Sequence, residues 1–136
     1  MAYFLAKTDP ETYSIDQLEK EKKTVWDGVN NPQAVRAIRE MRPGDKVFIY
    51  HSGGLSAVVG LARVLSEGRP DPKNPKSAVA DFEFQTRLDP PVMLAEIKQS
   101  KQFDDWALVR QGRLSTMAAP EKFVAWMRKK FPKAGI

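Results

Sequence analysis

The sequence predicts an α+β fold, in which five to six short strands form a small curved sheet or barrel with short helices packed around it. The segments with strand-like patterns are short, and they do not alternate regularly with helical segments. Gly60 lies within an apolar strand, where glycine commonly marks a bend or a bulge. The length of 136 residues suits one domain with a sizeable core, and we expect residues 1–136 to form that single domain.

The expected strands are recognised by apolar runs or by alternation of apolar and polar residues. They are residues 3–6, 47–50, 57–65 and 80–88, with a brief strand that runs into a helical turn at 92–98 and an extended segment at 113–117. Residues 69–77 contain three prolines, so we expect an irregular surface loop there. Pro90-Pro91 is expected to interrupt the strand that precedes it.

Helix starts are marked by capping residues. Ser14 and Gln17 form a capping box, and the charged residues 19–23 are expected to be the solvated end of that first helix. Asn31 caps a second helix, with Pro32 at its first position. The apolar faces are Ile15 and Leu18 in the first helix, Ala34, Ala37, Ile38 and Met41 in the second, and Phe123, Trp126, Met127 and Phe131 in a third that starts at Pro120.

The net charge is mildly positive. Twenty-two Lys and Arg against 17 Asp and Glu give +5 at pH 7. This charge suits a polyanionic partner such as nucleic acid, although many basic proteins bind none. The N-terminal residues lack the pattern of a signal peptide, and no run approaches the length that spans a membrane. We therefore expect a cytoplasmic protein without a membrane partner.

The composition also narrows the chemistry. The chain has no cysteine and a single histidine, His51, and no acidic spacing resembles a calcium loop. We therefore expect neither a metal site nor a cofactor. His51 and Ser52 are neighbours on a strand, so their side chains point to opposite faces and do not form a catalytic dyad.

The stretch from Trp26 to Ser52 combines a polar loop, a capped helix and a buried strand that ends in Tyr50-His51-Ser52. Such an arrangement is suited to placing side chains at a binding site. Two alternatives stay open at this point. His51 either contacts a ligand or bonds to backbone at the strand end, and Trp26 either lines a site or belongs to the core.

Four segments together resemble the EVE domain family. They are YFLAKTDPETYSIDQL, WDGVNNPQAVRAIREMRPGDKVFIYHS, PPVMLAEIK and RLSTM, in that order along nearly the whole chain. The resemblance implies a PUA-like fold, a curved mixed β-barrel with helices around it. It also implies nucleic-acid binding, in particular the reading of bases such as 5-methylcytosine and 5-hydroxymethylcytosine by flipping the base into a pocket.

The resemblance also implies which residues would form that pocket. They are Lys7, Thr8 and Asp9, then Trp26, Asn30 and Asn31, then Tyr50, His51 and Ser52, and finally Arg113, Leu114 and Ser115. Two positions depart from the family. Asn30 stands where arginine is frequent, and Asp9 stands where glutamate is common.

The favoured hypothesis is a non-enzymatic module that binds DNA or RNA carrying modified bases. An alternative is a small amidohydrolase acting on a modified nucleoside, with Lys7, Thr8 and Asp9 as candidate residues. These three lie in one short segment, which is poor geometry for a convergent catalytic site. A third possibility is a module that binds small molecules or proteins and is basic by coincidence. The sequence indicates no particular protein partner.

Overall fold

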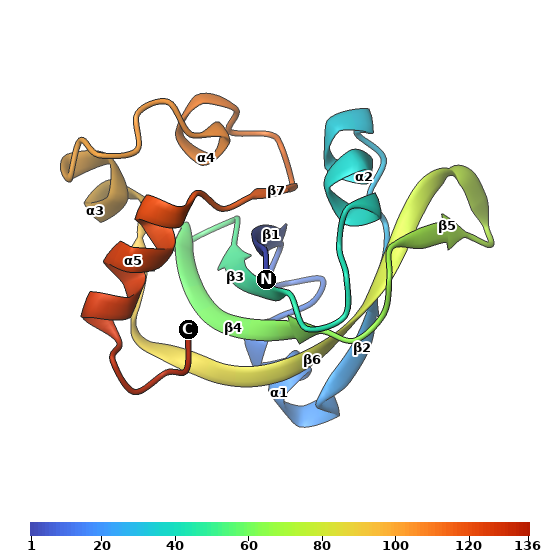
Figure 1. The fold of residues 1–136 in the computed structure, drawn as a ribbon, viewed down its shortest axis with the longest axis horizontal. Coiled ribbons are helices and arrows are strands. Elements are labelled where there is room, and N and C mark those ends of the chain that lie inside the picture. Colours follow the sequence, from blue (N-terminus) through green and yellow to red (C-terminus); the bar gives the residue numbers. More distant parts are fainter.

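A curved sheet of seven strands organises the chain, and the computed structural model describes all 136 residues (Figure 1). The strands are β1 (Tyr3–Thr8), β2 (Lys23–Trp26), β3 (Lys46–His51), β4 (Ala57–Val64), β5 (Arg69–Asp71), β6 (Asn74–Met93) and β7 (Thr116–Ala118). Their order is β2-β6-β4-β3-β1-β7, and β5 pairs with β6. Only β1 and β3 are parallel, so the sheet is mixed as expected.

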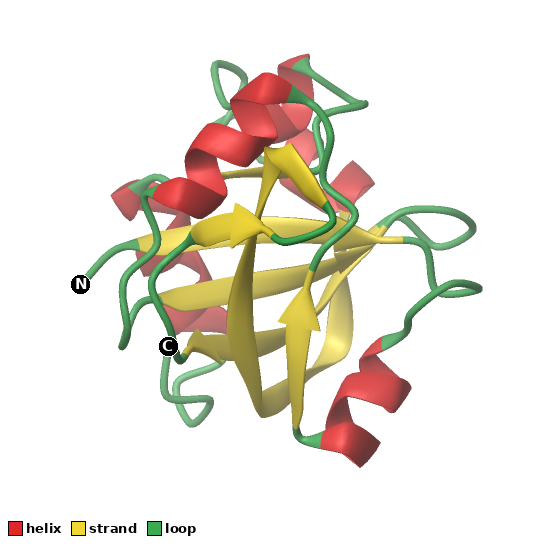
Figure 2. Ribbon diagram, turned by 90° about the vertical axis from the view of Figure 1, so that its right-hand side faces the viewer, coloured by secondary structure: helices red, strands yellow, loops and turns green.

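The sheet curves strongly but does not close into a barrel, and this curvature is seen from the side in Figure 2. Its two edge strands, β2 and β7, pair with β6 and β1 respectively and not with each other. The α+β class is confirmed, with seven strands rather than five or six. We call the gap between β2 and β7 the open seam.

Five short helices accompany the sheet. They are α1 (Ile15–Glu21), α2 (Pro32–Arg39), α3 (Leu94–Gln99), α4 (Ala107–Arg110) and α5 (Glu121–Lys130). Both predicted caps are present, because the Ser14 side chain accepts from the Gln17 amide and the Asn31 side chain accepts from the amides of Gln33 and Ala34. None of the helices combines the length and apolar character that crossing a bilayer requires.

The helices α3, α4 and α5 lie together on one side of the sheet, and α2 lies apart from them (Figure 1). An aromatic cluster fills the space beneath α5. The Phe123 ring meets Phe48 edge-on at 5.2 Å and Phe103 at 5.4 Å between ring centroids. All three rings are fully buried, so α5 seals the core with the apolar face expected from its sequence.

Gly60 marks the expected bulge. The register between β4 and β6 shifts between Val58 and Gly60, and a shift also occurs where β4 pairs with β3. A Cβ atom on Gly60 would lie 2.5 Å from Cδ1 of Ile15, so α1 packs directly on the bare backbone. Glycine therefore lets the sheet bend and lets α1 approach closely.

The expectation of an irregular loop at residues 69–77 was wrong. This segment holds β5 and the start of β6, which form a hairpin. The Asp71 carboxylate accepts from the Lys73 amide, and the Asn74 side chain accepts from the Lys76 amide. Proline is tolerated here because an edge hairpin leaves part of its amide positions unpaired.

The prolines 90 and 91 also do not end the strand, since β6 continues to Met93. They lie between Arg87, which pairs with Gly60, and Val92, which pairs with Val58. The register between β4 and β6 shifts between these two pairs, so the prolines are not required to donate a backbone hydrogen bond to β4. The third difference is β2, which the sequence analysis did not predict. This strand can begin at Lys23 because α1 already ends at Glu21 and the chain turns at Lys22 with φ 69°.

Candidate functional site

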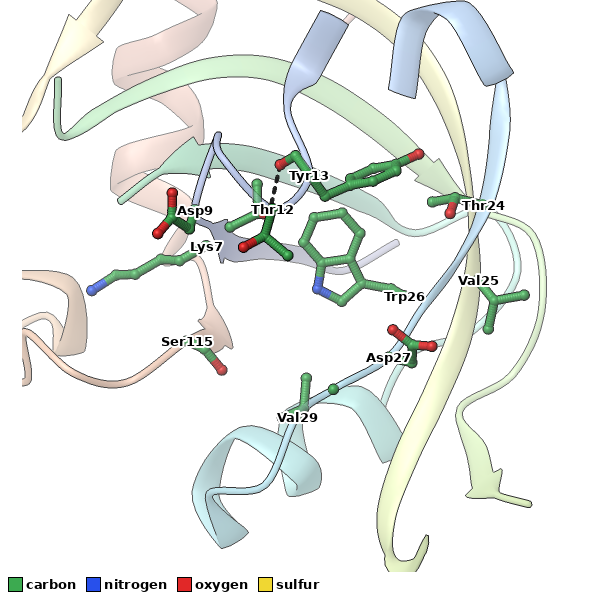
Figure 3. A pocket seen from close by; sticks show the side chains of 12 residues that line it. Lys7, Asp9, Thr12, Tyr13, Thr24, Val25, Trp26, Asp27, Val29 and Ser115 are labelled. Carbon is green, nitrogen blue, oxygen red and sulfur yellow. Dashed lines mark hydrogen bonds between the residues drawn. The ribbon is translucent and has the colours of Figure 1, made fainter. Parts of the chain in front are cut away.

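A pocket of about 530 Å³ opens at the seam of the sheet, and we call it the seam pocket (Figure 3). It lies between the edge strand β2 and the residues that lead into the other edge strand, β7. Its lining residues are Lys7, Thr8, Asp9, Thr12, Tyr13, Thr24, Val25, Trp26, Asp27, Gly28, Val29 and Ser115. The failure of the sheet to close therefore leaves a hollow of ligand size at the open seam.

Trp26 forms the apolar centre of the pocket wall (Figure 3). Its ring stacks on Phe82 at 5.1 Å between centroids with an interplanar angle of 24°, and Tyr13 meets it edge-on at 6.1 Å. Only 7% of the residue is exposed. The indole N–H donates to no protein atom, and no buried polar side-chain atom lacks a partner, so this N–H is accessible from the pocket. Trp26 thus belongs to the core and to the pocket at once.

Lys7 provides the positive charge of the seam pocket. Its ammonium donates to the Gly112 carbonyl at 3.0 Å and lies 5.4 Å from the centroid of the Tyr50 ring. Burial lowers the pKa of the Lys7 side chain from its ordinary value. In Figure 3 the Lys7 side chain extends away from Trp26, so its ammonium lies at the outer edge of the pocket.

The loop after β1 forms another wall. The carbonyl of Asp9 accepts from the amides of Thr12 and Tyr13, and the Thr8 hydroxyl donates to the Tyr13 carbonyl at 2.8 Å. One oxygen of the Asp9 carboxylate accepts from the Glu11 amide at 2.9 Å. These bonds fix Tyr13 against Trp26, where burial raises the pKa of the Tyr13 hydroxyl.

Asp27 offers a second carboxylate, on the far side of Trp26 from Asp9 (Figure 3). It is exposed and makes no hydrogen bond or ion pair with the protein. The hydroxyls of Thr12, Thr24 and Ser115 add groups that both donate and accept. The pocket therefore presents acceptors, donors and an aromatic edge, which suits a small planar ligand with a polar rim. No three His, Asp or Glu side chains gather closely enough to bind a metal ion.

The structure brings five of the twelve candidate residues into the seam pocket. They are Lys7, Thr8, Asp9, Trp26 and Ser115. The other seven lie outside its lining. They are Asn30, Asn31, Tyr50, His51, Ser52, Arg113 and Leu114.

Several of those seven have clear structural roles. Asn31 is the cap of α2, and Leu114 is buried in the core. The Nε2 atom of His51 accepts from the Ile15 amide at 3.0 Å, which is the backbone contact that the sequence left open as an alternative. Tyr50 is buried beneath Lys7, and the Ser52 amide donates to the Thr8 carbonyl. Asn30 and Arg113 are exposed.

The sequence did not single out seven lining residues, namely Thr12, Tyr13, Thr24, Val25, Asp27, Gly28 and Val29. Most of them belong to β2 or to the loop that follows it. Recognising Lys23–Trp26 as a strand would have placed Thr24 and Val25 beside Trp26. Thr12 and Tyr13 carry no local signal, because their position depends on the fold of the loop after β1.

The structure is thus a small α+β protein with a curved mixed sheet and a polar, tryptophan-lined pocket at its open seam. The EVE domain model matches residues 2–130, and the chain belongs to the EVE domain family.

Known relatives agree with this assignment. Human thymocyte nuclear protein 1 is 30% identical over 129 residues, covering 74% of this chain and 57% of that protein. The chain thus spans little more than half the length of this relative. A structure from Rhodopseudomonas palustris is 32% identical with a TM-score of 0.88, covering 96% of this chain and 92% of that one. The human THYN1 protein in complex with DNA containing 5-methylcytosine is 25% identical with a TM-score of 0.85, covering 96% of this chain and 98% of that one.

Proposed function

We propose that this protein binds nucleic acid and holds a modified pyrimidine base, of the 5-methylcytosine type, in the seam pocket. The observation that carries the proposal is the pocket itself, a ligand-sized hollow with an aromatic edge and polar rim in a fold shared with a protein that binds DNA containing 5-methylcytosine. We infer that the module is a binder and not an enzyme. His51, the one histidine, lies outside the pocket and is engaged with backbone.

Extruding a base from a strand costs a few kcal/mol of lost stacking and pairing, roughly. The accessible part of Trp26 can return some of this free energy, because contact between a base and an aromatic ring is worth about 1–3 kcal/mol. Since Trp26 is stacked on Phe82 and largely buried, it offers less than a free ring would. Hydrogen bonds to the edge of the base must therefore supply the remainder.

Cytosine presents an exocyclic amine that donates, beside ring positions that accept. Asp27 is the better acceptor for that amine, because its carboxylate has no protein partner, whereas Asp9 already accepts from the Glu11 amide. The indole N–H of Trp26 and the Ser115 hydroxyl can donate to the accepting positions. Val29 offers an apolar wall to a 5-methyl group, for which area alone predicts a preference of about 1 kcal/mol.

The test is fluorescence anisotropy against single-stranded and duplex oligonucleotides, in DNA and RNA, that carry one cytosine, 5-methylcytosine or 5-hydroxymethylcytosine. We expect tighter binding to one modified base, and the preference should persist at higher salt because base contacts do not depend on counterion release. Binding that ignores the modification and disappears with salt would contradict the proposal.

A pair of matched variants locates the binding site. Asp27→Asn removes one charge from the pocket, and Asp104→Asn removes one charge from an exposed residue outside its lining. We expect Asp27→Asn to weaken binding of the modified strand about tenfold, in the range of a hydrogen bond to a charged group. Asp104→Asn should bind like the wild type. Equal binding by all three proteins would exclude Asp27 from the site.

A further inference from the structure

Two of the exposed large apolar residues of this protein lie on neighbouring segments near one wall of the seam pocket. Apart from the terminal Met1 there are three, namely Val25, Leu55 and Met93, with exposed fractions of 49%, 48% and 36%. Val25 lies apart from the other two, because it pairs with Asp81 near the start of β6, whereas Met93 is the last residue of β6 and pairs with Ala57. Leu55 and Met93 lie on neighbouring segments, because the Leu94 amide donates to the Ser56 carbonyl at 2.9 Å. Leu55 and Met93 therefore form a small exposed apolar pair, which is the kind of surface that a binding partner can cover.

Leu55 lies in the turn between β3 and β4, and this turn approaches the Asp9 wall of the pocket. The turn begins at Ser52, whose amide donates to the Thr8 carbonyl at 2.9 Å. A Cβ on Gly53 would lie 3.6 Å from the Asp9 carboxylate, which lines the pocket. Leu55 follows two residues later, so its Cα lies within about 7 Å of the Cα of Gly53.

The backbone of this turn is constrained, and Leu55 within it is half-exposed. Gly53 and Gly54 have φ values of 64° and 73°, and Ser56 has a φ of 51°, which is uncommon for a residue with a Cβ. The Ser56 carbonyl is anchored to the start of α3 by the bond from Leu94. A short turn fixed at both ends presents Leu55 with little freedom to fold back onto the protein.

We propose that Leu55, supported by Met93, is a wedge that enters the base stack of a duplex beside the base held in the seam pocket. This inference rests on the proposed function. Proteins that distort DNA commonly insert an apolar side chain such as leucine or methionine between base steps, which replaces part of the stacking that is lost. Leu55 has the required chemistry and exposure, and its turn lies next to Asp9, which lines the pocket.

The wedge role predicts a defect that depends on pairing. We would compare Leu55→Ala with Leu55→Met on three DNAs, each with one 5-methylcytosine: a strand alone, a duplex with guanine opposite, and a duplex with an abasic site opposite. Leu55→Ala should bind the fully paired duplex about tenfold more weakly, and the other two DNAs within about twofold of wild type. Leu55→Met should bind all three DNAs nearly as well as wild type, because it keeps an apolar side chain of similar volume.

A second readout reports the wedge directly. The fluorescence of 2-aminopurine placed next to the 5-methylcytosine rises when its stacking is disturbed, and this rise should be smaller with Leu55→Ala than with wild type at saturation. Half-exposed Leu55 contributes little to folding, so both variants should melt within a few degrees of wild type.

Three outcomes would overturn the wedge and leave the proposed function standing. They are equal binding of the paired duplex by Leu55→Ala and wild type, an equal loss by Leu55→Ala on all three DNAs, and wild-type binding of the modified single strand without any binding of the duplex. The first of these would favour a protein partner at the apolar pair of Leu55 and Met93. If wild type distinguished no modified DNA in any form, the proposed function would fail as well.

Discussion

The Nε2 atom of His51 accepts a hydrogen bond of 3.0 Å from the backbone amide of Ile15 and so joins the end of β3 to the first residue of α1. The neutral ring must therefore carry its proton on Nδ1. If Nε2 were protonated, its N–H would face the Ile15 N–H, and neither group could accept a hydrogen bond from the other. The contact lies just after Tyr13 in the chain, so it also helps to place the loop that walls the seam pocket.

Burial lowers the pKa of His51 below the ordinary value of about 6.5. The unfolded chain then takes up a proton more readily than the folded protein, so stability should be complete above pH 6.5 and fall as the pH drops from there through the folded pKa. Asp16 on α1 and Arg87 and Asp89 on β6 line the same hollow as His51 and are the charges that face it.

Urea denaturation at several pH values between 7.5 and 5 checks this prediction. The His51→Gln variant cannot titrate in this range, so its unfolding midpoint should change less than that of wild type over the same interval. A parallel loss of stability in both proteins would show that other groups cause the pH dependence.

Trp26 should matter for folding as well as for binding. Truncation of a buried aromatic residue typically costs about 3–5 kcal/mol, and Trp26 is packed between Phe82 and Tyr13. We therefore expect Trp26→Ala to lower the free energy of unfolding by about this amount, and Trp26→Phe to lower it clearly less because the stack on Phe82 can persist. Denaturation followed by circular dichroism measures both changes. A stability of Trp26→Ala close to wild type would contradict this packing.

Local signals predicted α1, α2 and α5, whereas α4 was not predicted and α3 was expected only as a helical turn after a brief strand. The caps at Ser14 and Asn31 act within a few residues of themselves, so the sequence alone could locate the starts of α1 and α2. The bulge at Gly60 was predicted for a similar reason, since glycine within an apolar strand usually marks a bend or the close approach of another element. Such features depend on neighbours in the chain and can be recognised without knowledge of the fold.

Long-range pairing determines the features that the sequence did not predict. The strand β2 is short and largely exposed, and it exists because β6 pairs with it from Lys23 to Trp26. Which residues line the seam pocket likewise depends on the curvature of the whole sheet. Ser115 and Trp26 are distant in the chain and share a pocket only because β7 and β2 are the two free edges.

Variants of the neighbouring residues Asn30 and Asn31 should show whether each residue contributes to folding or to binding. Asn31→Ala removes the cap of α2, which typically costs about 1 kcal/mol, whereas Asn30→Ala changes an exposed residue and should stay within about 0.5 kcal/mol of wild type. Neither residue lines the seam pocket, so both variants should bind the modified strand as wild type does. Loss of binding by a stable Asn30→Ala protein would extend the site along the loop after β2.

Lys7 should contribute to binding through its charge. Loss of one phosphate contact lowers the slope of log affinity against log salt concentration by about 1 for double-stranded DNA. The matched control is Lys133, an exposed lysine beside the C-terminus. Gly135, two residues further on, accepts from the Lys46 ammonium at the start of β3, so Lys133 lies near the opposite end of β1 and β3 from Lys7. Lys7→Met and Lys133→Met therefore remove the same charge from opposite ends of these strands.

We expect Lys7→Met to flatten the salt dependence and Lys133→Met to leave it unchanged, measured by anisotropy titrations at four salt concentrations. If Lys7→Met weakens binding by the same factor at every salt concentration, the ammonium contacts the base and not the phosphate. Equal flattening by both variants would mean that net charge alone determines the salt dependence. In that case the positive side of the seam pocket would have no special part in holding the strand.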